Sequence, residues 1–295
     1  MADGLRMIVM VPHPPRIIEE VGDRHNVQSA TLSVQALNRL ALRICEAAPE
    51  TVIILTPHAP ISREAFGVHV GDVLRGSFAH YGCFSLRFEF ESDLLLVDEI
   101  ISEAFDRGIK TFEIPDGTPL DHGMLVPLYF LTRAGWRGKV VGIGCSLLPH
   151  EVHVTFGQGI DRAVAALGRR AVFIASGHLS HRVSEMSPAG FDPRARQFDE
   201  RIVEALRSGE FVAICQIEND LRIRASECGY RPLLVALGAV GLRGINHEVL
   251  CYESPFGVGY LVAVLADLTA GERHSETPPV STAAERAASS LDDQL

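Results

Sequence analysis

Residues Met7–Pro15 read MIVMVPHPP, an apolar run followed directly by a proline, a histidine and two further prolines. Residues Thr51–Pro60, TVIILTPHAP, repeat this arrangement. Runs that are apolar at every position fit strands buried on both faces, as in a parallel or mixed sheet. Because proline stops a strand and stiffens the backbone beside it, His13 and His58 are both expected at rigid strand ends. The two stretches predict an α/β fold whose ligand-binding residues lie at the strand ends.

Elements of the same kinds follow along the rest of the chain. Lys139–Gly144 and Ala171–Ala175 predict two more buried strands, and the alternating Cys83–Phe90 predicts a half-exposed strand. A closing strand pair is predicted at Val249–Tyr252 and Gly257–Leu265. Amphipathic stretches predict helices at residues 27–48, 91–107, 123–134, 150–167, 193–208, 210–217 and 226–238. The pattern predicts an α/β domain with a central mixed β-sheet flanked by helices.

Domain organisation follows from where the composition changes. No linker or internal repeat divides residues 1–268, which we interpret as one domain. After Leu268 the chain is rich in Ser, Thr, Ala, Pro and charged residues and poor in large apolar ones. Residues 269–295 are therefore predicted to form a disordered polar tail.

Charge and composition exclude several classes of protein. The 295 residues include 27 basic and 37 acidic side chains, a net charge of −10, which disfavours a general nucleic-acid binder. No apolar segment approaches the ~20 residues of a membrane helix. The six cysteines are scattered without a CxxC pair, which is typical of reduced thiols. We expect a cytoplasmic protein that binds neither nucleic acid nor membrane.

Five histidines lie at predicted strand ends or in glycine-containing turns. They are His13, His58, His122 in Asp121-His122-Gly123, and His178 and His181 in SGHLSH. A single histidine after a strand is more often a surface or hydrogen-bonded residue than a ligand. Several such sites at one sheet edge instead favour a metal or catalytic centre.

The ligand types narrow the choice of metal. No cysteine lies near a histidine with zinc-ribbon spacing, so structural zinc is disfavoured. Two histidines and a carboxylate form the facial triad of Fe(II) oxygenases, and the same set suits catalytic zinc. Glu227 is a candidate carboxylate, although position alone explains it as an acidic residue in a first helical turn.

Five motifs occur in order: VPHPP, TPHAP, DHGMLVPL, SGHLSHR and SECGYRPL. Together they resemble the class III extradiol ring-cleavage dioxygenases of the LigB-like superfamily, which also includes Memo-like proteins. The resemblance covers about residues 7–267. It implies a single α/β domain with a central mixed sheet.

The resemblance also implies roles for individual residues. His13, His58 and Glu227 match the iron ligands, His181 the general base, and His122 a second active-site histidine near substrate and oxygen. The role of His178 stays open. Memo-like relatives have a cysteine where this chain has Cys228, but the glutamate before it favours Glu227 as the ligand.

The function implied is Fe(II)-dependent cleavage of a catecholic or aminophenolic ring by O2, which gives a ring-opened semialdehyde-type acid. Relatives of this kind imply a homo-oligomer. One alternative is a Memo-like, metal-binding or redox-linked protein without dioxygenase activity. Another is a zinc hydrolase that uses the same ligands.

Overall fold

The computed structural model describes residues 4–269. Except for Thr269, the predicted tail lies outside these residues. No helix within residues 4–269 is long and apolar enough to cross a membrane.

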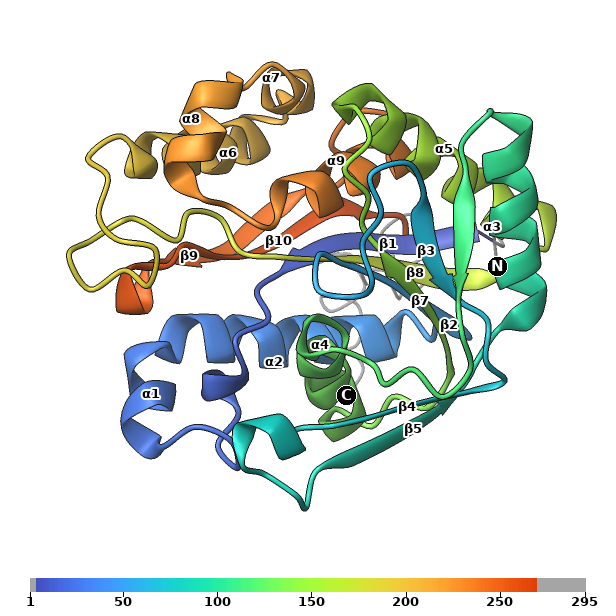
Figure 1. The fold of residues 1–295 in the computed structure, drawn as a ribbon, viewed down its shortest axis with the longest axis horizontal. Helices are drawn as coiled ribbons and strands as arrows, with labels where there is room; N and C mark the ends of the chain where they lie inside the picture. Colours follow the sequence, from blue (N-terminus) through green and yellow to red (C-terminus); the bar gives the residue numbers. More distant parts are fainter. Residues whose placement is uncertain (1–3, 270–295) are drawn as a thin grey trace, which may run out of the picture.

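An eight-stranded mixed sheet forms the centre of the fold, with strand order β6-β3-β7-β2-β8-β1-β10-β9 (Figure 1). The four central strands β7, β2, β8 and β1 are parallel to one another. Strands β3 and β10 pair antiparallel with β7 and β1, and β9 pairs antiparallel with β10. The strands are β1 (Gly4–Val11), β2 (Thr51–Thr56), β3 (Phe66–His69), β6 (Thr111–Ile114), β7 (Lys139–Gly144), β8 (Arg170–Ser176), β9 (Glu248–Glu253) and β10 (Tyr260–Asp267). This confirms the predicted mixed sheet.

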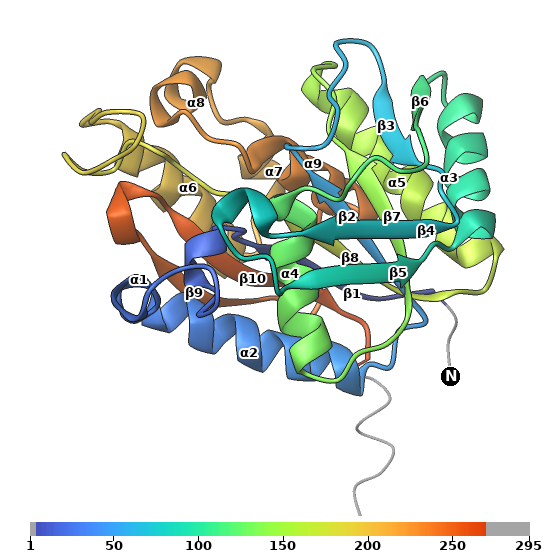
Figure 2. The ribbon, with the colours of Figure 1, turned by 60° about the horizontal axis from the view of Figure 1, so that its bottom comes forward.

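Helices cover both faces of this sheet. Helices α2 and α4 lie on one face, and α5 and α9 lie on the other (Figures 1 and 2). The helices are α1 (Arg24–Ser29), α2 (Thr31–Glu46), α3 (Leu94–Asp106), α4 (His122–Arg133), α5 (His150–Ala166), α6 (Ala195–Ser208), α7 (Phe211–Cys215), α8 (Asn219–Ala225) and α9 (Tyr230–Ala239). Along β1, Met7 and Val9 enter the core beneath α2 and α4, whereas Ile8 and Met10 enter the opposite core. Burial of both faces explains why the run is apolar throughout.

A second, two-stranded sheet lies across the α4 side of the molecule (Figure 2). It pairs β4 (Val73–Ser77) antiparallel with β5 (Arg87–Glu91). Only the second half of the predicted strand Cys83–Phe90 is therefore a strand. Strands β3, β4 and β6 were not predicted, because each is only four or five residues long and β4 and β6 are partly exposed.

Two predicted helices differ from the structure in ways that matter for the site. The stretch 27–48 is divided at Ala30 into α1 and α2. The stretch 226–238 becomes helical only at Tyr230, because Ser226 has a left-handed backbone (φ 53°) that ends α8 instead. Helix α8 was not predicted. The segment Ser226–Gly229 is thus a connection between α8 and α9.

His69 at the end of β3 makes the stability of the fold sensitive to acid. Its side chain is 2% exposed, Nε2 has no hydrogen-bond partner, and burial lowers its pKa to about 4. Between the unfolded pKa of about 6.5 and this value, only the unfolded chain binds the proton, so stability falls as pH falls. Urea unfolding at pH 7 and pH 4.5 is expected to show a loss of stability of about 2 kcal/mol from this group. His69→Leu should remove that part of the loss; an unchanged pH dependence in the variant would contradict it.

Candidate metal centre

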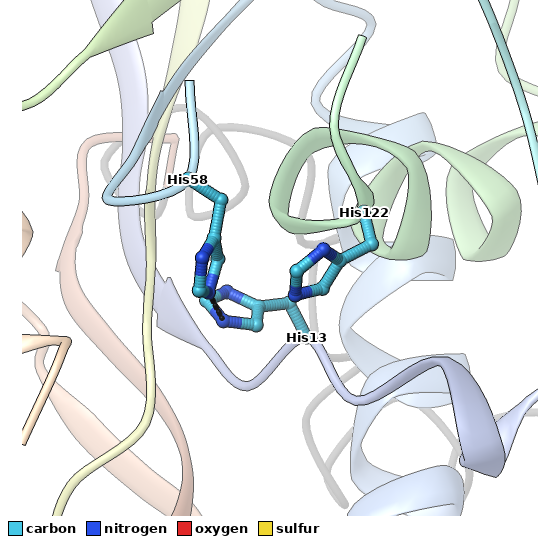
Figure 3. A group of neighbouring side chains, drawn as sticks. All are labelled: His13, His58 and His122. Atoms are coloured by element: carbon cyan, nitrogen blue, oxygen red, sulfur yellow. Dashed lines mark hydrogen bonds between the residues drawn. The ribbon is translucent and has the colours of Figure 1, made fainter. Parts of the chain in front are cut away.

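Three imidazoles meet where the central parallel strands end. His13 follows β1, His58 follows β2, and His122 is the first residue of α4. Nε2 of His13 lies 3.0 Å from Nε2 of His58, and one nitrogen of each of the three rings lies within 4.8 Å of the others. Figure 3 shows the three rings turned toward one another. The structure thus brings residues 109 positions apart in the chain to one point.

Hydrogen bonds on its far side determine which nitrogen of His13 faces the cluster. The Ser176 hydroxyl donates to the Gly123 carbonyl at 2.5 Å, so its oxygen accepts from Nδ1 of His13 at 2.9 Å. Because His13 is fully buried and its pKa is well below the usual value, through desolvation first and neighbouring histidines second, the ring is neutral. Its proton is then on Nδ1, and Nε2 presents a lone pair to His58. A hydrogen bond of this type is how proteins orient a metal-binding histidine.

A second chain of hydrogen bonds connects His58 to the start of α4. The hydroxyl of Thr56 accepts from the His58 backbone N–H at 3.2 Å and donates to Oδ1 of Asp121 at 2.9 Å. Asp121 caps α4 by accepting from the Gly123 N–H at 2.7 Å. The Asp-His-Gly motif therefore sets His122 at a helix start beside His58. Burial, followed by the charge of His58, lowers the pKa of His122 to about 4.

Cys228 and His178 also lie beside His13. The ligand atoms of His13, His178 and Cys228 also lie within 4.8 Å of one another. Sγ of Cys228 accepts from the His178 backbone N–H at 3.2 Å and lies 4.0 Å from Nε2 of His13. Nε2 of His178 accepts from the His13 backbone N–H at 3.3 Å. That nitrogen is therefore engaged in a hydrogen bond, whereas the sulfur faces the cluster. Burial raises the pKa of the Cys228 thiol to about 12.

Glu227 belongs to neither group of ligand atoms. Its Oε1 pairs with Arg222 at 2.8 Å, and its Oε2 accepts from the Tyr230 backbone N–H at 2.8 Å. Both carboxylate oxygens are thus occupied at the start of α9. Of the residues that the resemblance named as ligands, the structure brings His13 and His58 together. The Cys228 sulfur, and not the Glu227 carboxylate, lies beside His13.

His181 lies in the turn after β8, beside His178, with their ring centroids 5.4 Å apart. Its Nδ1 donates to the Ser226 carbonyl at 2.7 Å, which leaves the lone pair on Nε2. Burial lowers its pKa, while the Ser226 carbonyl and the charge of Glu227 oppose that shift. A neutral, partly exposed imidazole with a free Nε2 is able to accept a proton at neutral pH.

The donor set fits a divalent metal ion. Two imidazole nitrogens that bind one metal at 2.0–2.1 Å, at right angles, lie roughly 3.0 Å apart. This is the separation between Nε2 of His13 and Nε2 of His58. The hydroxyls of Ser176 and Thr56, which hold His13 and His58 in place, were not identified from the sequence. Thr56 ends β2 two residues before His58, and Ser176 ends β8 two residues before His178; this spacing is the one signal in the sequence that points to the two hydroxyls.

Comparisons with known proteins match the fold and the motif order. Residues 7–263 match the family described as the catalytic LigB subunit of aromatic ring-opening dioxygenase. Protein CA_C1420 of Clostridium acetobutylicum is 33% identical over 272 residues, which are 89% of this chain and 58% of that protein. The 3,4-dihydroxyphenylacetate 2,3-dioxygenase of Escherichia coli is 24% identical over 72% of this chain and 81% of its own length.

A MEMO1 family protein of Methanococcoides burtonii is 28% identical over 49% of this chain and 55% of its own length. This chain therefore spans little more than half the length of the Clostridium protein and of the Methanococcoides protein. The match over residues 7–263 covers nearly all of the described fold, including every histidine of the cluster. The chain belongs to the LigB family, that of the catalytic subunit of aromatic ring-opening dioxygenases.

Proposed function

We propose that this chain opens the ring of a small aromatic diol or aminophenol with O2, at a metal ion held by His13 and His58. The single observation that carries the proposal is the pair of Nε2 atoms 3.0 Å apart, with the Nε2 lone pair of His13 set by Ser176. The match to the family of ring-opening dioxygenases supports the reaction class. Fe(II) is the proposed metal, and zinc is the alternative. A bound Fe(II) would supply coordination positions for both the substrate oxygens and O2.

The surrounding residues have proposed roles that follow from their contacts. We propose Cys228 as the third protein ligand because its sulfur lies 4.0 Å from Nε2 of His13. The ligand atom grouped with those of both His13 and His58 is that of His122, which is the competing third ligand. His181 accepts a proton from a substrate hydroxyl through Nε2, since its Nδ1 is bonded to Ser226. His122 is neutral and lies beside His58, where it would hydrogen-bond to substrate or to oxygen.

The direct test is an anaerobic metal analysis followed by an oxygen-consumption assay with catechols and aminophenols. The proposal predicts one iron per chain and one O2 consumed per ring opened, with the absorbance of a semialdehyde-type product. Bound metal with no ring cleavage for any diol or aminophenol would contradict the proposed reaction.

One observation favours a second function. A thiolate is a softer ligand than a carboxylate and shifts a site toward zinc or Cu(I). Because Cys228 faces His13 while Glu227 is held by Arg222, this chain also fits a metal-binding protein without ring-cleaving activity. The similarity to a MEMO1 family protein supports that alternative, and the same assay separates the two functions.

Cys228→Ser tests the third ligand. We expect the Co(II)-substituted protein to show a thiolate-to-metal charge-transfer band that the variant lacks, with weaker metal binding. Cys251→Ser, in β9, is the matched control and should keep both band and affinity. An unchanged spectrum in Cys228→Ser would show that the sulfur does not bind the metal.

The homo-oligomer and the cytoplasmic location stay predictions. Measuring the size of the protein in solution tests the oligomeric state.

A further inference from the structure

We propose that Glu227 and Arg222 form a positioning pair that holds the segment Ser226–Gly229 against the histidines, with Glu227 itself outside the metal's ligand set. The inference rests on the proposed metal centre. It gives Glu227 a role that follows from its contacts in this chain.

The ion pair between Arg222 and Glu227 is buried, and both side chains make further contacts that fix their positions. The side chains of Arg222 and Glu227 are 6% and 7% exposed, and the guanidinium lies 4.1 Å from the centre of the Tyr230 ring. The Tyr230 hydroxyl donates to the Ile214 carbonyl at 2.7 Å, and Nη1 of Arg222 contacts Nε2 of His150. An ion pair that is desolvated and hydrogen-bonded in this way fixes one geometry. It connects the middle of α8 to the first residue of α9.

The residues on either side of Glu227 both reach the site. The Ser226 carbonyl accepts from Nδ1 of His181 at 2.7 Å, and Sγ of Cys228 accepts from the His178 N–H at 3.2 Å. The Gly229 N–H donates to the His178 carbonyl at 2.8 Å. A Cβ on Gly177 would lie only 2.2 Å from Cα of Gly229, so the two backbones are in close contact. A shift of this segment therefore moves the thiol and the proposed base together.

The backbone at Ser226 and the contact with Arg222 determine where the Glu227 and Cys228 side chains point. The backbone of Ser226 is left-handed, with φ of 53°, which ends α8 and turns the chain toward the turn after β8. The Glu227 carboxylate then points back to Arg222 on α8, while Cys228 points to His13 and His178. Arg222 and Glu227 thus set which of two adjacent side chains faces the metal.

Glu227→Gln tests the pair with the side-chain volume preserved. Arg222 and the Tyr230 N–H donate to different oxygens of the carboxylate. In the amide one of these oxygens is replaced by an NH2 group, which donates and cannot accept, so one of the two hydrogen bonds is lost. We expect Co(II) to bind roughly 10–100-fold more weakly, as for loss of a residue that orients a ligand. The thiolate-to-cobalt band should persist but change in energy or intensity. A merely structural role would leave the band unchanged.

Two further variants separate positioning from stability. Glu227→Gln leaves the charge of Arg222 buried without its partner and should lower the melting temperature. Arg222→Met/Glu227→Gln removes both charges, so its melting temperature should be higher than that of Glu227→Gln, while Co(II) binding stays at least ~10-fold weaker than in wild type. Asp93→Asn breaks the buried contact with Arg169 at the other end of β2 and should lower the melting temperature without changing Co(II) affinity.

The outcomes are distinguishable. Wild-type affinity and an unchanged band in Glu227→Gln would overturn the positioning role while leaving the metal centre intact. Loss of all Co(II) binding in Glu227→Gln, with binding kept in Cys228→Ser, would make Glu227 a ligand and overturn the inference. A wild-type protein that binds no Co(II) would instead refute the proposed metal centre.

Discussion

His58→Ala is expected to remove the metal from the protein while leaving the fold in place. His58 is an exposed side chain after β2, so its truncation leaves no buried cavity. Its Nε2 lies 3.0 Å from that of His13, and losing one of two imidazole ligands should weaken metal binding by more than the roughly 10–100-fold cost of losing a ligand's hydrogen-bond partner. Metal analysis after dialysis measures the change, and ring-opening activity should disappear with the metal.

The matched control is His25→Ala, which removes an exposed imidazole on α1 outside the cluster. It should keep one metal per chain. Full metal occupancy in His58→Ala, with an unaltered melting temperature, would show that His58 is not a ligand.

His181→Ala is expected to keep the metal and to lose turnover. The reason is that His181 is bonded through Nδ1 to Ser226 and presents Nε2 as a base, but lies outside both groups of ligand atoms. Removing a general base costs roughly 10²–10⁴-fold in kcat. Because burial lowers the pKa of His181, the acid limb of kcat/KM in wild type should lie below the ordinary value of about 6.5.

In the variant this limb should be lost, since the imidazole that acts as the base is no longer there to be protonated. Metal content and the pH profile are the two readouts. Loss of the metal in His181→Ala would move the residue into the ligand set and contradict the assigned role.

The buried central strands were the most predictable part of the fold. Thr51–Thr56 and Lys139–Gly144 have the predicted bounds, because burial on both faces leaves an unbroken apolar run. The convergence of His13 and His58 was also predictable, because each follows a buried strand and parallel strands end at the same edge of the sheet. Strand β6, with part-exposed residues at three of its four positions, has no such signal and was missed.

The proposed third ligand illustrates what sequence alone could not predict. Glu227 and Cys228 are adjacent, and both residue types bind metals. Which one faces the histidines depends on Arg222, which lies on the unpredicted helix α8, and on the left-handed backbone at Ser226. A tertiary ion pair of this kind leaves no periodic pattern in the sequence.

The most direct test of the account is anomalous diffraction from crystals of the protein reconstituted anaerobically with iron, recorded at the iron absorption edge. The account predicts one peak per chain, within bonding distance of Nε2 of His13, Nε2 of His58 and Sγ of Cys228. A peak bonded to the Glu227 carboxylate, or no peak beside His13 and His58, would contradict it.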